Sequence, residues 1–221
     1  VVCIDEFQQI GEWADSLTIQ KRMRSVWQHQ QHTSYCLFGS KKHLLANLFQ
    51  NRRMPFYHFG DTIFLKSIST NDWIPFICGK FVEKGKKISE ELVSKICSTV
   101  ASHSSYVQQL AWNIMVNTET EVTDEIFQQS ISELLAQCSP LFIQQIQGLT
   151  TYQMNLIRCL CQGVRKDFTS KDVLETYQLG SKSNISRLKK TLVEKEIIEE
   201  EGDTITLADP IFELWFKREY M

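Results

Sequence analysis

The stretch VVCIDEFQQI, residues 1–10, opens with four apolar residues that lead directly into Asp5 and Glu6. A short apolar run of this kind predicts a β-strand that is buried on both faces, as in a parallel sheet. Carboxylates at the end of a buried strand are costly unless they have a role. In this setting the usual role is to handle Mg²⁺ and a water beside a nucleotide phosphate, so the stretch raises the question of where a phosphate-binding loop lies.

Composition limits the kinds of protein this chain can be. The 221 residues are 43% apolar and carry a net charge of −2, so overall charge predicts neither a nucleic-acid nor a membrane partner. No apolar run reaches the roughly 18 residues of a membrane span. The seven cysteines lack framework spacing, which favours reduced thiols in a cytoplasmic protein. Cys159 and Cys161 leave a metal or redox site open as an alternative.

The first third of the sequence alternates between strand-like and helix-like segments. Strands are predicted at residues 1–4, at 34–40 (SYCLFGS) and at 61–68 (DTIFLKSI), and helices at 17–31 and 41–50. Strand, helix, strand, helix, strand is the rhythm of a parallel sheet with crossover helices.

From about Thr70 the pattern becomes helical. Thr70 or Asn71 can cap a helix that carries Trp73, Phe76 and Phe81, which we expect in a hydrophobic core. Further helices are predicted over residues 89–101, 104–117 and 123–137. The sequence therefore predicts an all-helical unit with short connections.

The last third has the pattern of a winged helix-turn-helix. In order, the predicted elements are a helix at 150–162, a short helix capped by Ser170, a turn at 179–181, a helix at 182–195, and strands at 197–200 and 204–207 that are joined by a hairpin turn.

Taken together, this order of elements resembles the AAA+ ATPases, and most closely their STAND-like, archaeal-type group. VVCIDEFQ (1–8) is similar to the Walker B strand of that family, and YCLFGS (35–40) to its sensor 1 strand. MPFYHFGDTIFLKSI (54–68), SHSSYVQQLAW (102–112) and LADPIFELWFKR (207–218) are similar to family motifs before, within and after the helical lid.

The resemblance implies an α/β plus all-α architecture in three domains. Residues 1–69 would form part of a parallel-sheet nucleotide-binding core of the AAA+ type, residues 70–148 a helical lid, and residues 149–221 the winged helix-turn-helix. The chain would be the C-terminal part of an ATP-binding ATPase that acts as a nucleotide-dependent switch, and its winged helix would serve as a clamp or as a module that binds an unknown protein partner.

The resemblance also assigns roles to four residues. Asp5 would hold Mg²⁺ through water, and Glu6 would polarise the water that attacks the phosphate. Ser40 would contact the γ-phosphate or that water, and His103 would contact the nucleotide. Each has a structural alternative: Asp5 and Glu6 as solvent-facing caps of a helix at 7–14, Ser40 as the cap of the helix at 41–50, and His103 as a buried structural histidine, since Ser104 replaces the proline of the family motif.

The family's phosphate-binding loop, Gly-x-x-x-x-Gly-Lys-Ser/Thr, does not occur in the 221 residues. GSKK (39–42) and GKK (85–87) contain glycine and lysine but lack its spacing. We therefore expect this chain to belong to a longer ATPase, or to be a degenerate member that has lost the loop. ATP or ADP and Mg²⁺ are expected in the full-length parent; this chain alone is expected to bind no cofactor and to be inactive.

The winged helix leaves two hypotheses open. Lys182, Arg187, Lys189 and Lys190 suit the phosphates of DNA, whereas the acidic stretch EKEIIEEEGD (194–203) would repel them, so any DNA binding is expected to be weak. One hypothesis is the nucleotide switch; the alternative is a DNA-binding or protein-interaction module without nucleotide chemistry.

Overall fold

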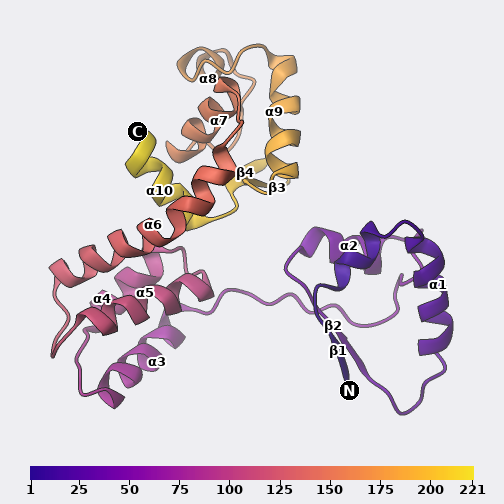
Figure 1. Ribbon diagram of the computed structural model, residues 1–221. Coiled ribbons are helices and arrows are strands. Elements are labelled where there is room, and N and C mark those ends of the chain that lie inside the picture. Colours follow the sequence, from indigo (N-terminus) through magenta and orange to yellow (C-terminus); the bar gives the residue numbers. More distant parts are fainter. The chain divides into compact units, whose positions relative to one another are not determined.

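The computed structural model describes residues 1–221, apart from the side chains of residues 42 and 43. The chain divides into two compact units, residues 1–66 and residues 67–221. In Figure 1 the first unit runs from indigo to violet and the second from magenta to yellow.

The first unit is built on two short parallel strands. β1 (Val2–Ile4) pairs with β2 (Tyr35–Leu37), so that Cys3 lies opposite Cys36 in the register. The connection between the strands contains a 3₁₀ helix, η1 (Phe7–Glu12), and α1 (Ser16–Trp27); α2 (Lys42–Gln50) follows β2. The first two predicted strands, the two predicted helices and the parallel pairing are confirmed.

Only one face of this sheet is covered, which corrects the prediction that the first strand is buried on both faces. Ile4 and Leu37 pack against a core of Phe7, Ile10, Leu48 and Phe56. Cys3 and Cys36, whose side chains lie on the other face, are exposed. The reason is physical: the helices and aromatic side chains of this unit gather on one side of the two-stranded sheet, and its other side faces solvent.

The third predicted strand, at 61–68, is wrong. These residues adopt no regular secondary structure, and the side chains of Ile63 and Leu65 are 81% and 83% exposed. A strand needs a neighbour to satisfy its backbone N–H and C=O groups. In the described chain β1 and β2 pair only with each other, so this segment lacks such a neighbour and its backbone stays open to water.

The second unit is helical and ends in a β-hairpin and a last helix. Its elements are α3 (Thr70–Glu83), α4 (Glu90–Thr99), α5 (Ser104–Asn117), α6 (Asp124–Ile146), α7 (Thr151–Cys161), α8 (Lys171–Thr176), α9 (Lys182–Glu194), β3 (Ile198–Glu201), β4 (Thr204–Leu207) and α10 (Pro210–Tyr220). All the predicted helices and both strands of the hairpin are confirmed.

Hydroxyl side chains fix where most of these helices begin. Ser89, Thr123 and Ser170 each accept a hydrogen bond from a backbone N–H in the first turn, and the cap at Ser170 is the one predicted above. For α3 the cap is Ser69, which accepts from the N–H of Asp72, and not Thr70 or Asn71. The predicted start of α3 was therefore wrong by one or two residues, because serine, threonine and asparagine are all favoured at cap positions.

Buried side chains form one continuous core through the second unit, from Trp73 on α3 to Phe216 on α10. Phe76 is an exception among the aromatic residues predicted to be buried, since its side chain is 51% exposed. The buried stripe of α3 follows Trp73, Ile77 and Phe81 at four-residue spacing, and Phe76 lies at its edge.

The long helix α6 links the helical part of this core to the winged helix. Phe142 packs against Phe212 and Trp215, each with ring centroids 5.4 Å apart, and the indole N–H of Trp215 donates to Ser139 at 3.0 Å. A second link comes from α5: the Tyr106 hydroxyl donates to the Asp209 carboxylate at 2.5 Å. Burial, and then this bond, raise the pKa of Tyr106.

Among the described helices, none is both long and apolar enough to cross a membrane.

We predict that α6 carries a large share of this unit's stability. Leu134→Ala removes a side chain that is 0% exposed and should lower the free energy of unfolding by about 2–5 kcal/mol. The control, Leu141→Ala, changes a 56% exposed side chain of the same helix and should cost less than about 0.5 kcal/mol. Urea denaturation followed by far-UV circular dichroism measures both; equal costs would contradict the packing described for α6.

Candidate functional site

Polar side chains gather at one edge of the β1–β2 sheet. Because the strands are parallel, Asp5 and Glu6 after β1 lie beside Gly39 and Ser40 after β2. Backbone bonds hold the two chain segments together: the N–H of Phe38 donates to the carbonyl of Ile4, and the N–H of Phe7 donates to that of Phe38, both at 3.0 Å. Ser40 Oγ donates to Glu6 Oε1 at 3.3 Å, so the structure brings these two predicted site residues into contact.

The Glu6 carboxylate is held from both sides. Besides Ser40, the side-chain amide of Gln8 donates to Glu6 Oε2. The backbone of Glu6 is left-handed, with φ of 49°, a conformation that costs a non-glycine residue about 1–3 kcal/mol and that six other non-glycine residues of the chain share. Its N–H donates to Asp5 Oδ1 at 2.7 Å, while the Asp5 side chain itself is exposed.

The capping roles expected for these residues are wrong, although Asp5 does face solvent as its structural alternative expects. Glu6 occupies the cap position of η1, but no side chain caps that helix, and Asp5 accepts from Glu6 instead of from the helix. Ser40 does not cap α2 either, because the helix starts at Lys42 with Lys41 in the capping position. Its hydroxyl therefore points to Glu6 and away from the helix terminus.

Gln8 is a site residue that sequence reasoning missed. Its side chain is only 2% exposed, and its Oε1 has no hydrogen-bond partner in the described part of the chain. A Cβ added to Gly39 would lie 1.8 Å from that oxygen, so a side chain at this position would force the Gln8 amide to move. The sequence did contain a signal for Gln8: it is a polar residue between the apolar residues Phe7 and Ile10, three positions after Asp5.

His103 lies in the second unit, at the cap position of α5, and its side chain makes no capping bond. The ring is exposed, with its centroid 4.8 Å from that of Tyr106. The alternative of a buried structural histidine is therefore wrong. The predicted nucleotide contact of His103 stays a prediction.

The carboxylates at the strand ends suit a cation such as Mg²⁺ that is also coordinated by the phosphate oxygens of a bound ligand. Among the described side chains, no group of three or more His, Cys, Asp and Glu residues is placed to hold a metal ion by itself. Asp5 and Glu6 offer carboxylate oxygens only, and Mg²⁺ is commonly held by one or two carboxylates together with phosphate oxygens and water. The residues therefore fit a magnesium–phosphate ligand better than a bare metal. Cys159 and Cys161 form no such site: both are buried, and burial raises the pKa of each thiol to about 12.

The cations of α9 are arranged unevenly. Lys182, Arg187 and Lys190 are exposed, and Arg187 donates to Asn184 at 2.9 Å. Lys189 instead lies over the ring of Phe168, 5.1 Å from its centroid. The neighbouring hairpin presents three exposed carboxylates on β3, those of Glu199, Glu200 and Glu201. A basic helix thus stands beside an acidic wing.

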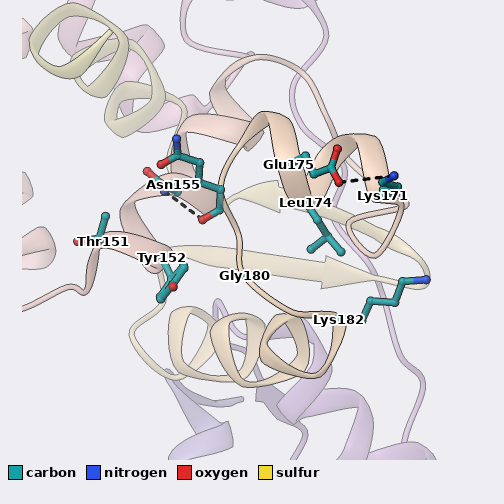
Figure 2. A pocket seen from close by; sticks show the side chains of 9 residues that line it. Thr151, Tyr152, Asn155, Lys171, Leu174, Glu175, Gly180 and Lys182 are labelled. Carbon is teal, nitrogen blue, oxygen red and sulfur yellow. Dashed lines mark hydrogen bonds and ion pairs between the residues drawn. The ribbon is translucent and has the colours of Figure 1, made fainter.

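A wide pocket opens on the same part of the winged helix (Figure 2). Its volume is about 890 Å³, and it is lined by Thr151, Tyr152, Asn155, Lys171, Leu174, Glu175, Gln178, Gly180 and Lys182. Gly180 has φ of +81°, and a Cβ there would lie 3.3 Å from the Tyr152 ring, so glycine suits this turn. Figure 2 shows Lys171 and Glu175 paired on α8, with Lys182 at the start of α9.

Comparisons with known proteins agree with this fold. Residues 140–218 match a family model described as a probable winged helix domain. A Walker-type ATPase of Pyrococcus abyssi superposes with a TM-score of 0.72 at 15% sequence identity, over 98% of this chain and 62% of that protein. The chain thus has an ATPase-like fold that includes a winged helix, and it spans about 62% of the length of that structure. No curated protein matches the sequence.

We predict that Gly39 is required by its contact with Gln8. Gly39→Ala should destabilise the β1–β2 pair by about 1–3 kcal/mol, because the added methyl group displaces the Gln8 amide. Amide hydrogen exchange of Phe38, whose N–H bonds to Ile4, measures this local opening energy.

Two further variants isolate the cause. Gly60→Ala in the same unit meets no atom within 4 Å and should leave the exchange rate nearly unchanged. In a Gln8→Ala background, the cost of Gly39→Ala should fall, because the clashing amide is gone. An undiminished cost in that background would show that the contact with Gln8 is not the reason.

Proposed function

We propose that this chain is part of a STAND/AAA+-type ATPase that acts as a nucleotide-dependent switch and lies in the cytoplasm, a location favoured by seven cysteines of which none forms a disulfide. The observation that carries the proposal is the contact between Ser40 and Glu6 at the carboxyl ends of two parallel strands. Ligands of open α/β sheets bind at the carboxyl ends of the strands, and the similarity to a Walker-type ATPase fold supports the same interpretation.

The residues of the strand ends have separate tasks in this proposal. Asp5, which is exposed, would hold Mg²⁺ through water. Glu6 would orient and polarise the attacking water, and the bonds from Gln8 and Ser40 would keep its carboxylate in place. When bound, ATP would supply the phosphoryl group, and Mg²⁺ would supply the positive charge that this edge of the sheet lacks.

The phosphates themselves need a loop of backbone N–H groups and a lysine, and no such motif is found in the 221 residues. We therefore place the activity in a longer protein that contributes this loop. The winged helix would then act as a clamp or bind a protein partner, since its acidic β3 strand opposes binding to phosphate backbones.

Two measurements test the ATPase proposal. Calorimetry with ATP and Mg²⁺ should find no low-micromolar binding to the 221-residue chain. In the full-length protein, Glu6→Gln should lower ATP turnover by about 10²–10⁴-fold while nucleotide binding remains, because only the water-activating carboxylate is lost. Glu12→Gln changes an exposed glutamate at the end of η1 and serves as the control. Full turnover by Glu6→Gln would refute the assigned role.

A second candidate function is DNA binding without nucleotide chemistry, which the exposed cations of α9 favour. Lys182, Arg187 and Lys190, together with Lys189 once it leaves the Phe168 ring, allow about four phosphate contacts, so affinity for duplex DNA should fall about a hundredfold or more between about 50 and 200 mM salt. Fluorescence anisotropy measures this dependence.

Neutralising the wing tests whether its carboxylates oppose DNA binding. Changing Glu199, Glu200 and Glu201 together to glutamine should raise DNA affinity, because three exposed carboxylates no longer repel phosphates. Glu119→Gln, an exposed glutamate outside the winged helix, should not. Tight, sequence-selective binding by the unmodified chain at about 200 mM salt would favour the DNA-binding function over the clamp.

A further inference from the structure

Two cysteines lie side by side on the open face of the β1–β2 sheet. The register makes Cys3 and Cys36 direct partners across the two strands. Side chains alternate between the faces of a strand, so both thiols lie on the face opposite to Ile4 and Leu37, which pack on the aromatic core. Both cysteines are exposed and neither forms a disulfide.

The strand geometry places the two thiols within reach of each other. Neighbouring strands lie about 4.7–4.9 Å apart. This separation falls within the range of about 4.4–6.8 Å that Cα atoms span in disulfides. Closing the bond therefore needs a rotation of the two side chains and a small approach of their Cβ atoms. Backbone pairing already holds the partners in register.

The remaining cysteines are poorer reaction partners. Cys97, Cys159 and Cys161 are buried, and Cys78 and Cys138 are half-buried. Burial raises the pKa of all five thiols, which lowers the fraction of the reactive thiolate. Exposure, by contrast, leaves Cys3 and Cys36 open to a reagent in solution.

We propose that Cys3 and Cys36 form a modification site, a thiol pair that closes reversibly by exchange with a small-molecule disulfide such as oxidised glutathione. One thiolate attacks the glutathione disulfide, forms a mixed disulfide and releases the first glutathione thiol. The second thiolate then attacks the protein sulfur of that mixed disulfide, closes the Cys3–Cys36 bond and releases the second glutathione. The two protein thiols lose two electrons, which reduce the glutathione disulfide, and excess reducing thiol reverses both steps.

The test treats the native chain with oxidised glutathione and then blocks the remaining thiols with iodoacetamide. The expected product has lost two of its seven free thiols, carries no glutathione, and weighs two hydrogen atoms less before blocking. Trypsin cuts after Lys21, Arg22 and Arg24, so the two cysteines fall in different peptides. Mass spectrometry should find these peptides joined, and dithiothreitol should separate them.

Two single variants serve as controls. Cys36→Ser should stop at the mixed disulfide, with one glutathione on Cys3 and no internal bond, whereas Cys78→Ser should close the Cys3–Cys36 bond as the unmodified chain does. Circular dichroism confirms that both variants fold. The proposal fails if each exposed thiol of the unmodified chain instead keeps its own glutathione. It also fails if both stay reduced, or if Cys3 is joined to another cysteine or to a second molecule.

Discussion

Parallel pairing of β1 with β2 is the interaction on which the candidate site depends. Each strand has only three residues, yet their common direction brings the segments that follow them to one edge of the sheet. Glu6 and Ser40 are separated by about half of the first unit in sequence and meet only for this reason. The aromatic core beneath Ile4 and Leu37 supports the pair, because two strands alone are marginally stable in water.

The second unit solves a different problem, since its helices must bury apolar faces against one another. α6 does this for two groups of elements at once, and Phe142 with Trp215 joins the helical part to the winged helix. The bond from Tyr106 to Asp209, which also caps α10, adds a polar link between the same parts. α5 and α6 are thus connected to the winged helix both by packing and by a hydrogen bond.

Sequence reasoning succeeded where local chemistry decides the structure. Capping hydroxyls such as Ser89 and Ser170, and the glycine turn of the hairpin, mark element boundaries directly. It failed where partners decide: the segment at 61–68 has the composition of a strand but no neighbour. Glu6 and Ser40 could be named in advance, whereas their hydrogen bond, and the role of Gln8 beneath them, depend on register and packing that no sequence pattern displays.

The left-handed backbone of Glu6 has a consequence for how this protein can change. Glycine adopts that conformation without strain, so replacement of Glu6 by glycine would relax the chain while removing the carboxylate. Selection for thermal stability alone would then favour loss of the Glu6 carboxylate. Selection for the chemistry of that carboxylate would instead retain the strained backbone. Laboratory evolution toward heat tolerance, without a screen for activity, is expected to accept glycine at position 6 and so to lose the candidate site.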